Sequence, residues 1–355
     1  MSEKLMVKGT EAIGESAIRA GCRHYFGYPI TPQSELTEYM ARRLPKIGGV
    51  FLQAESEVAV VNMLYGVSCV GKRVMTSTSS PGFSLMQEGI SYMACAELPA
   101  VFVNVMRGGP GLGDIQPAQG DYFQATKGGG HGDYRMIVLA PSTLQEAVDL
   151  TYISFDIAEK YRNPVLILAD GMIGQMMEPV EFPEFVDVEK LKEPDWILNG
   201  ADGRDPRRIT SFDIDPHNLE KIILHLMEKY RKAEENEKRW EDFMVDDAEY
   251  LFVAYGTMAR ILKTVVKLAR KEGIKVGLIR PITLWPFPYE RIEEMAERVG
   301  FILAVEMSTG QMVEDVRLAV KGKTEVLFYG RPGGVIPSPF EVLEVLKKYV
   351  KKVRV

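Results

Sequence analysis

Short apolar runs alternate with stretches of helical periodicity from residue 24 to residue 170. Predicted strands cover 24–29, 49–54, 73–79, 100–106, 136–141 and 164–170, and predicted helices cover 34–44, 55–71, 81–95 and 142–161. Strands separated by helices of this length need crossover connections, which give a parallel sheet. Because the strand runs are almost entirely apolar, we expect helices to cover both faces of that sheet.

The segment from about 175 to 245 breaks this pattern because it is rich in Pro, Glu, Asp and Lys. Its only long predicted element is a charged helix over 215–243, which is typical of a solvated connector. A second alternation of strands and helices runs from 249 to 351. The chain is therefore predicted to be an α/β protein with one domain at 1–185, a connector with a long helix at 186–245 and a second domain at 246–355.

Composition and charge exclude several classes of protein. The 43 Lys and Arg residues and 49 Asp and Glu residues give a net charge of −6, which offers no footprint for nucleic acid or an anionic membrane. Three scattered cysteines without a C-x-x-C motif exclude zinc ribbons and cysteine-ligated iron–sulfur clusters, so no metal site is expected on this chain. No apolar run reaches about 18 residues and the N-terminus lacks a signal-peptide core, so we expect a cytoplasmic protein.

Common nucleotide and nucleophile motifs are also absent. The glycine-rich segment at 108–113, GGPGLG, follows a predicted strand, but it lacks G-x-G-x-x-G spacing and does not open a helix. Neither a P-loop nor a G-x-S-x-G elbow occurs. Dinucleotide binding, P-loop phosphate binding and serine-hydrolase chemistry are therefore not predicted.

Three residues at predicted strand ends are candidates for chemistry, since open parallel sheets bind ligands at that edge. Glu57 begins the helix after strand 49–54 and can hold or donate a proton there, or it can simply compensate the helix dipole. Arg107 ends a buried strand and can grip a carboxylate in a bidentate manner, or it can form an ion pair with Asp114 or Asp121. Thr31 lies between two prolines that fix its direction, although the same turn can be a rigid connector.

Four motifs occur in one order: Y-P-I-T-P at 28–32, A-E-S-E-V-A at 54–59, T-S-T-S-S-P-G at 76–82 and R-G-G-P-G at 107–111. With them the chain, over about 5–350, resembles the α subunits of 2-oxoacid:ferredoxin oxidoreductases. The resemblance implies a thiamine diphosphate-binding fold, with a pyrimidine-type parallel-sheet domain followed by a transketolase C-terminal-like α/β domain. It implies coenzyme A-dependent oxidative decarboxylation of a 2-oxoacid, with electrons passed to ferredoxin.

The resemblance also assigns partners and site residues. Thiamine diphosphate is shared with a β subunit, Mg²⁺ and 4Fe–4S clusters belong to partner subunits, and a γ subunit and a ferredoxin or ferredoxin-like δ subunit complete the complex. Glu57 corresponds to the catalytic glutamate that hydrogen-bonds the cofactor's aminopyrimidine ring. Thr31 and Arg107 correspond to substrate-binding residues, and Pro29 and Ser80 are expected beside the cofactor.

The substrate is predicted less directly. The segment after Arg107 looks more like the branched-chain (2-oxoisovalerate) branch of the family, and no Lys or Arg occurs before Lys127. A 2-oxoglutarate site needs a second cation for the distal carboxylate, because an unpaired buried charge is costly. Two alternatives stay open, namely 2-oxoglutarate as substrate and a non-catalytic partner that shares the fold. A transketolase-like enzyme complete in one chain is disfavoured because the diphosphate-binding domain has no room here.

Overall fold

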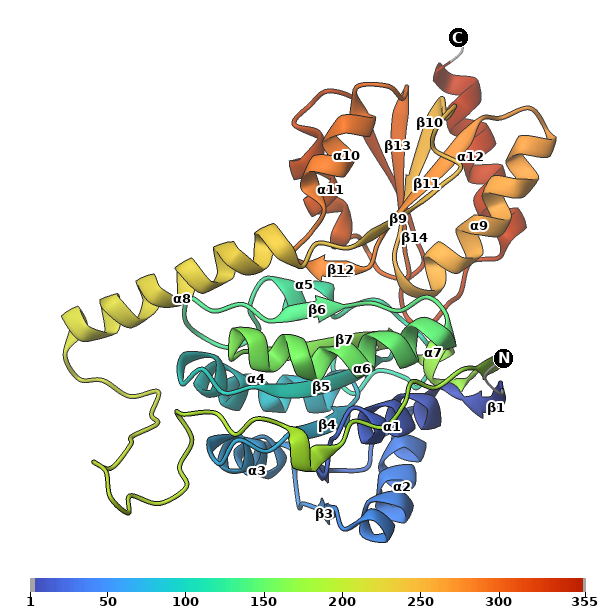
Figure 1. The fold of residues 1–355 in the computed structure, drawn as a ribbon. Coiled ribbons are helices and arrows are strands. Elements are labelled where there is room, and N and C mark those ends of the chain that lie inside the picture. The colour runs from blue at the N-terminus through green and yellow to red at the C-terminus, as the bar shows by residue number, and fades with distance from the viewer. Residues whose placement is uncertain (1–3, 354–355) are drawn as a thin grey trace.

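The computed structural model describes residues 4–353 and consists of two sheet-centred halves joined by a long helix (Figure 1). Residues 1–3 and 354–355, at the ends of the two predicted domains, lie outside the described part. The N-terminal half contains β1 (Leu5–Lys8), α1 (Gly9–Arg19), β2 (His24–Gly27), α2 (Ser34–Arg43), β3 (Val50–Gln53), α3 (Glu57–Cys69), β4 (Val74–Thr78), α4 (Ser80–Cys95), β5 (Ala100–Met106), α5 (Tyr122–Thr126), β6 (Ile137–Leu139), α6 (Leu144–Tyr161), β7 (Pro164–Asp170), α7 (Gly171–Gln175) and β8 (Met177–Val180).

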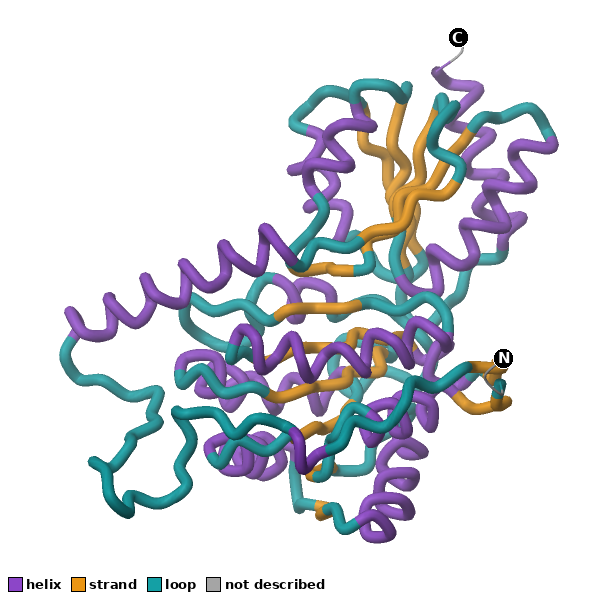
Figure 2. Tube along the Cα trace, viewed as in Figure 1, coloured by secondary structure: helices purple, strands orange, loops and turns teal. Residues whose placement is uncertain are grey.

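The remaining elements form the connector and the second half, which Figure 2 shows as a second group of strands flanked by helices. They are α8 (Pro216–Asn236), β9 (Trp240–Phe243), β10 (Tyr250–Val253), α9 (Gly256–Lys271), β11 (Val276–Pro281), β12 (Thr283–Trp285), α10 (Tyr289–Ala296), β13 (Phe301–Glu306), α11 (Met312–Val320), β14 (Glu325–Gly330) and α12 (Pro339–Val353).

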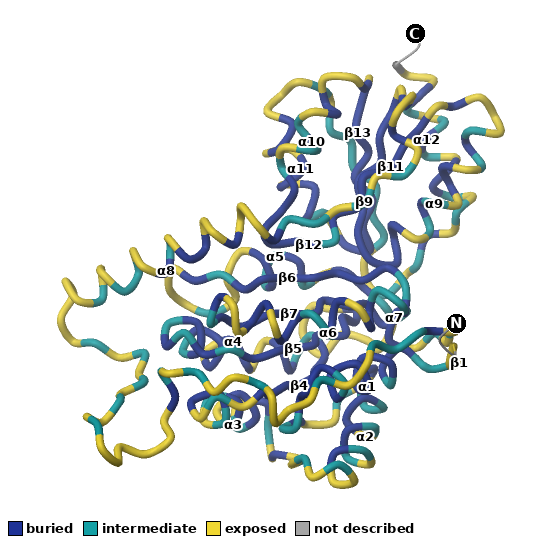
Figure 3. The backbone as a smooth tube through the Cα atoms, in the orientation of Figure 1, coloured by how far each residue is buried: buried dark blue, intermediate teal, exposed yellow. Residues whose placement is uncertain are grey.

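The predicted parallel sheet is confirmed. The first sheet has the order β12-β6-β7-β5-β4-β2-β3, and every neighbouring pair from β6 to β3 is parallel. Its central strands β5 and β7 are buried along their whole length, as expected for apolar strands covered on both faces (Figure 3). The second sheet, β14-β13-β10-β11-β9, is parallel except for β9.

Two elements differ from the expected pattern. The helix predicted over 215–243 ends at Asn236, and residues 240–243 form β9, which pairs antiparallel with β11. Side chains of β9 alternate between exposed and partly buried positions, which is the two-residue period of a strand. In addition, β12 leaves the second half and pairs antiparallel with β6, so the second half contributes an edge strand to the first sheet.

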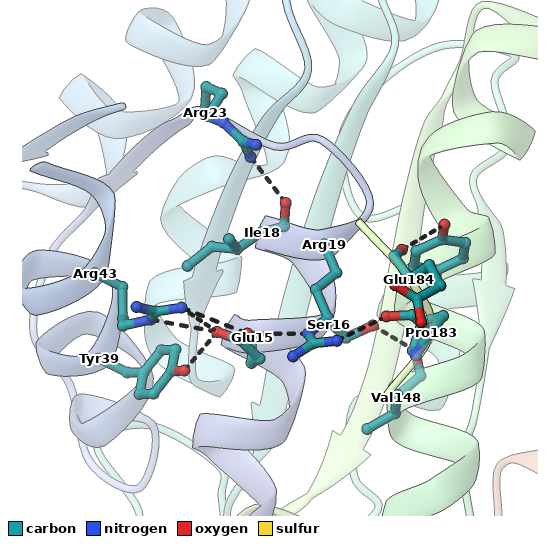
Figure 4. Close-up of polar contacts among 11 residues, drawn as sticks. Glu15, Ser16, Ile18, Arg19, Arg23, Tyr39, Arg43, Val148, Pro183 and Glu184 are labelled. Carbon is teal, nitrogen blue, oxygen red and sulfur yellow. Dashed lines mark hydrogen bonds and ion pairs between the residues drawn. The ribbon is translucent and has the colours of Figure 1, made fainter. Parts of the chain in front are cut away.

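Helix α1 was not predicted, because its glycines and polar residues obscure the helical period. It is almost fully buried, and Glu15 at its centre is only 7% exposed. The Glu15 carboxylate accepts hydrogen bonds from Arg19, from Arg43 and from the Tyr39 hydroxyl, as Figure 4 shows. The buried charge is therefore paired and fully hydrogen-bonded, which fixes α1 against α2.

In the described part of the chain, no helix combines the length and the apolar character needed to cross a bilayer.

Candidate functional site

The predicted site residues follow four neighbouring strands of the first sheet. Arg107 follows β5, Ser80 follows β4, Thr31 lies in the turn after β2, and Glu57 begins the helix after β3. The carboxyl ends of parallel strands meet at the same edge, so the sheet order β5-β4-β2-β3 places all four along one line. This is the edge where open α/β sheets bind ligands.

Glu57 is a buried carboxylate that has no partner. It is 4% exposed and forms no hydrogen bond or ion pair with any described residue. Its carboxylate lies against the first turn of α4, where a Cβ added to Gly82 would be 2.4 Å from Oε1 of Glu57 and 2.1 Å from Oγ1 of Thr78. Gly82 therefore provides the space that this carboxylate occupies, and the carboxylate oxygens are not sealed off from a ligand. A buried acid without a protein partner is free to bond a ligand.

Arg107 joins two loops through its guanidinium group. Nη1 donates to the carbonyl oxygen of Thr31 at 2.9 Å, and Nη2 donates to the carbonyl oxygen of Leu112 at 2.8 Å. The side chain is 7% exposed, forms no ion pair with Asp114 or Asp121, and its Nε is buried without a partner. Because a guanidinium has five N–H donors, Arg107 retains donors for an anionic ligand.

Ser80 links the backbone of Arg107 to a carboxylate that the sequence had suggested only as an ion-pair partner. Its Oγ accepts a hydrogen bond from the Arg107 N–H at 3.0 Å and donates one to Oδ2 of Asp121 at 2.6 Å. The Asn104 amide donates to the same oxygen at 2.9 Å. Burial raises the pKa of Asp121, and the hydrogen bonds from Ser80 and Asn104 oppose that rise.

A cavity of about 410 Å³ opens beside these residues, between the two halves of the chain. Among its lining residues Arg107 is the only cation and Asp121 the only anion. The first half contributes Ser80, Pro81, Ser84, Arg107, Gly109, Pro110, Gly111, Ala118, Gly120, Asp121 and Gln124, and the second half contributes Met307, Ser308, Thr309, Gln311, Pro332 and Gly333. Glu57 does not line this cavity, since it lies against Gly82 in the first turn of α4.

Thr31 lines a separate cavity of about 480 Å³, together with Ile115, Met172 and Ile336. Its side-chain hydroxyl has no partner among the described residues, whereas its carbonyl oxygen binds Arg107. Pro29 is exposed on the same turn and lines neither cavity. The structure therefore brings Thr31, Arg107 and Ser80 into one bonded chain, with Glu57 and Pro29 outside it.

A buried polar network that the sequence analysis missed supports the turn after β2. Gln33 is fully buried, and its Oε1 accepts hydrogen bonds from Ser77 at 2.6 Å and from Thr37 at 3.1 Å. The Tyr25 hydroxyl bonds to both of these hydroxyl groups, and burial raises the pKa of Tyr25 to about 12. Complete hydrogen bonding makes such a network rigid, so it fixes the position of Thr31.

Gln119 holds the two walls of the 410 Å³ cavity together. Its backbone N–H donates to the carbonyl oxygen of Met307 at 2.9 Å, and its side-chain Oε1 accepts from the Met307 N–H at 3.0 Å. Its Nε2 also donates to the carbonyl oxygen of Tyr255 at 3.0 Å. Nearby, the buried Asp170 accepts two hydrogen bonds from Thr257, through its N–H at 3.0 Å and its hydroxyl at 2.6 Å. The relative position of the halves is thus fixed by buried polar contacts.

The doubly covered parallel sheet, with an unpaired glutamate at its carboxyl edge and a second α/β half closing the site, defines a thiamine diphosphate-type fold. The family "Pyruvate flavodoxin/ferredoxin oxidoreductase, thiamine diP-bdg" matches residues 15–245, and the family "Pyruvate:ferredoxin oxidoreductase core domain II" matches residues 248–342. The chain belongs to the 2-oxoacid:ferredoxin oxidoreductase family, which confirms the predicted fold class and family.

The relatives of this chain include subunits of ketoisovalerate oxidoreductase and of 2-oxoglutarate synthase. Ketoisovalerate oxidoreductase subunit VorB of Methanothermobacter marburgensis is 52% identical over 97% of this chain and 96% of that protein. The 2-oxoglutarate synthase subunit KorA of Methanothermobacter thermautotrophicus is 36% identical over 98% of this chain and 99% of that protein. A solved 2-oxoglutarate:ferredoxin oxidoreductase from Magnetococcus marinus, with 2-oxoglutarate, coenzyme A and succinyl-CoA bound, superposes with a TM-score of 0.86 at 26% identity, covering 98% of this chain and 66% of that chain. A split-gene transketolase at 14% identity, with a TM-score of 0.58, shares the fold alone.

Within residues 4–353, no group of three or more His, Cys, Asp or Glu side chains is placed to hold a metal ion.

Proposed function

We propose that this chain is the subunit of a 2-oxoisovalerate:ferredoxin oxidoreductase that supplies the catalytic glutamate and the substrate arginine. The reaction is the coenzyme A-dependent oxidative decarboxylation of a branched-chain 2-oxoacid to acyl-CoA and CO₂ in the cytoplasm, with two electrons passed to ferredoxin. Two observations support the branched-chain substrate. The more similar of the two relatives above is named for ketoisovalerate, and the cavity beside Arg107 has no second cation for a distal carboxylate.

The observation that carries the proposal is the buried, unpaired Glu57 carboxylate. Thiamine diphosphate, when bound, supplies the carbon nucleophile and the electron sink for decarboxylation. The residues present fit this cofactor, because the Glu57 carboxylate has no protein partner and the absence of a side chain at Gly82 lets it lie at the carboxyl edge of the sheet. We assign to Glu57 the proton shared with the nitrogen of the aminopyrimidine ring, and we place Pro29 and Ser80 near the cofactor.

The substrate contacts follow from the charges at the sheet edge. Arg107, whose Nη1 and Nη2 each donate one N–H to a loop carbonyl and keep a second, binds the 2-oxoacid carboxylate, and the hydroxyl of Thr31 donates a hydrogen bond to the substrate. The Arg107–Thr31 hydrogen bond couples these two contacts. A β subunit would supply the diphosphate and Mg²⁺ site and a 4Fe–4S cluster, and a γ subunit and a ferredoxin-like δ subunit would complete the assembly.

The test uses the complex reconstituted from this chain and its partner subunits. Glu57→Ala should lower 2-oxoisovalerate turnover by about 10²–10⁴-fold, the usual contribution of a positioned acid or base, while leaving the melting temperature of the complex nearly unchanged. Glu55→Ala is the matched control, because Glu55 lies two residues earlier and is exposed. Near-normal turnover in the Glu57→Ala complex would mean that this chain is a non-catalytic partner.

Substrate choice needs a separate measurement. We expect kcat/KM for 2-oxoisovalerate to exceed that for 2-oxoglutarate by about 100-fold or more, because the distal carboxylate of 2-oxoglutarate would be buried without a partner. Equal or reversed values would assign the chain to the 2-oxoglutarate branch and would leave the Glu57 assignment intact.

A further inference from the structure

The 410 Å³ cavity contains a carboxylate that the 2-oxoacid does not explain. A 2-oxoacid at neutral pH presents a carboxylate and a carbonyl group, which are hydrogen-bond acceptors only. Arg107 suits such a ligand, but Asp121 lines the same cavity and would repel it. The remaining acceptor capacity of this acid suits a different ligand group, one that donates a hydrogen bond.

Structural hydrogen bonds account for only one of the two carboxylate oxygens of Asp121. It occupies the N-cap position of α5, yet its side chain makes no capping hydrogen bond. It forms no salt bridge with any described residue, Arg107 included. Its Oδ2 receives both available hydrogen bonds, one from Ser80 and one from Asn104. These two donors fix the direction of the carboxylate without using Oδ1.

The second oxygen of Asp121 is the one without a hydrogen bond. Oδ1 has no hydrogen-bond partner. Unlike the Nε of Arg107, it is not sealed from solvent. Because Asp121 lines the cavity and its Oδ2 is already bonded, Oδ1 is the acceptor that this residue can offer to a bound molecule. The surrounding wall mixes hydroxyl and amide groups, from Ser84, Gln124 and Thr309, with apolar surface from Met307.

Size also indicates a second ligand. A cavity of about 410 Å³ falls within the range of roughly 300–1,000 Å³ that holds drug-sized molecules, so it has room for part of a larger ligand beside the 2-oxoacid and the cofactor's edge at Ser80. A wall that contains both polar and apolar groups suits a flexible chain that carries amide N–H groups and ends in a thiol. The acyl acceptor of the proposed reaction is a thiol of this kind.

We propose that Asp121 is a binding residue for the thiol-bearing acyl acceptor, and that its Oδ1 accepts a hydrogen bond from an N–H or O–H group of the acceptor's pantetheine arm. The inference rests on the proposed function and extends it to the second substrate. Arg107 and Asp121, connected through Ser80, then divide the cavity into an anion-binding part and a donor-binding part.

The test compares Asp121→Asn with Asp114→Asn in the reconstituted complex. Asp114 lies on the neighbouring loop, is exposed and does not line the cavity. In Asp121→Asn we expect the KM for coenzyme A and the Kd for desulfo-coenzyme A, measured by calorimetry, to rise about tenfold or more. The KM for 2-oxoisovalerate should stay within about twofold, and Asp114→Asn should change none of these values. Unchanged coenzyme A constants, or an effect on the 2-oxoacid alone, would overturn the assignment.

Ser84→Phe provides a second variant if Asp121→Asn does not fold. Ser84 is an exposed position of α4 that lines the cavity, so a larger side chain there narrows the cavity without disturbing the core. Desulfo-coenzyme A binding should weaken, and an unaffected Kd would also refute the proposal. Single-turnover release of CO₂ without coenzyme A distinguishes a failure of the proposed function from a failure of the Asp121 assignment. If the wild-type complex releases none, the proposed function fails. If it does release CO₂ but neither variant alters coenzyme A binding, only the role of Asp121 fails.

Discussion

Gly82 controls the position of the Glu57 carboxylate, so Gly82→Ala tests the site without touching a charged residue. The new Cβ would lie 2.1 Å from Oγ1 of Thr78 and 2.4 Å from Oε1 of Glu57, and real Cβ contacts are essentially never below 3.0 Å. Both side chains must therefore move. Alanine is better than glycine in a helix by about 1 kcal/mol, whereas overpacking costs about 1–3 kcal/mol. We expect unfolding free energy to fall by only about 0–2 kcal/mol.

The effect on cofactor binding should be larger than the effect on stability. A hydrogen bond to a charged group is worth about 1.5–3 kcal/mol, so displacement of Glu57 should weaken thiamine diphosphate binding by roughly 10- to 150-fold. The assay is a fluorescence titration of the reconstituted complex with the cofactor, alongside thermal melting. Gly66→Ala in α3 is the control, because nothing lies within 4 Å of the added Cβ. Cofactor affinity that is equal in the two variants would refute this account of Glu57.

Three further predictions follow from buried polar groups. Asp170→Ala removes the acceptor of four hydrogen bonds, two of them from Thr257 across the two halves, so urea unfolding should show a loss of about 3–5 kcal/mol; a loss below about 1 kcal/mol would contradict the role of this contact. Burial lowers the pKa of Lys229 from 10.5 to about 8. The unfolded chain therefore binds more protons between these values, and stability should rise with pH across that window by about 3 kcal/mol relative to Lys229→Met; parallel pH–stability curves would show that burial does not shift this lysine. Arg107→Lys keeps the charge but cannot bridge both loop carbonyls and a carboxylate, so the KM for the 2-oxoacid should rise about 10- to 100-fold, and an unchanged KM would remove Arg107 from the substrate site.

Elements with a strong local period could be predicted from the sequence. The apolar runs that became β5 and β7 and the amphipathic pattern of α6 were identified because each is long and regular. Helix α1 was missed because Gly9 and Gly14 stand where neighbouring atoms leave no room for a side chain. Strand β12 was missed because its three residues, Thr283–Trp285, are too few to show a period. They also pair with residues far away in the chain, which no local pattern can reveal.

The site shows the same division between local and long-range information. Glu57, Thr31 and Arg107 were identified because each follows a predicted strand, and the parallel sheet brings those strand ends to one edge. The cavity itself could not be predicted, since residues 80–124 form one wall and residues 307–333 the other. The sequence predicts for Asp121 only an ion pair with Arg107, because the hydrogen-bond partners of each carboxylate oxygen depend on contacts between distant residues.

The placement of β12 limits how this gene can be cut and recombined. A chimera that joins the first half of one homologue to the second half of another would pair Thr283–Trp285 of one protein with Val138 and Leu139 of the other. Where the side chains of the two proteins do not fit each other, this pairing weakens, and β6 then exposes unpaired backbone groups that favour aggregation. Functional hybrids should therefore be built by exchanging β6 and β12 as one block, even though more than 140 residues separate them in the sequence.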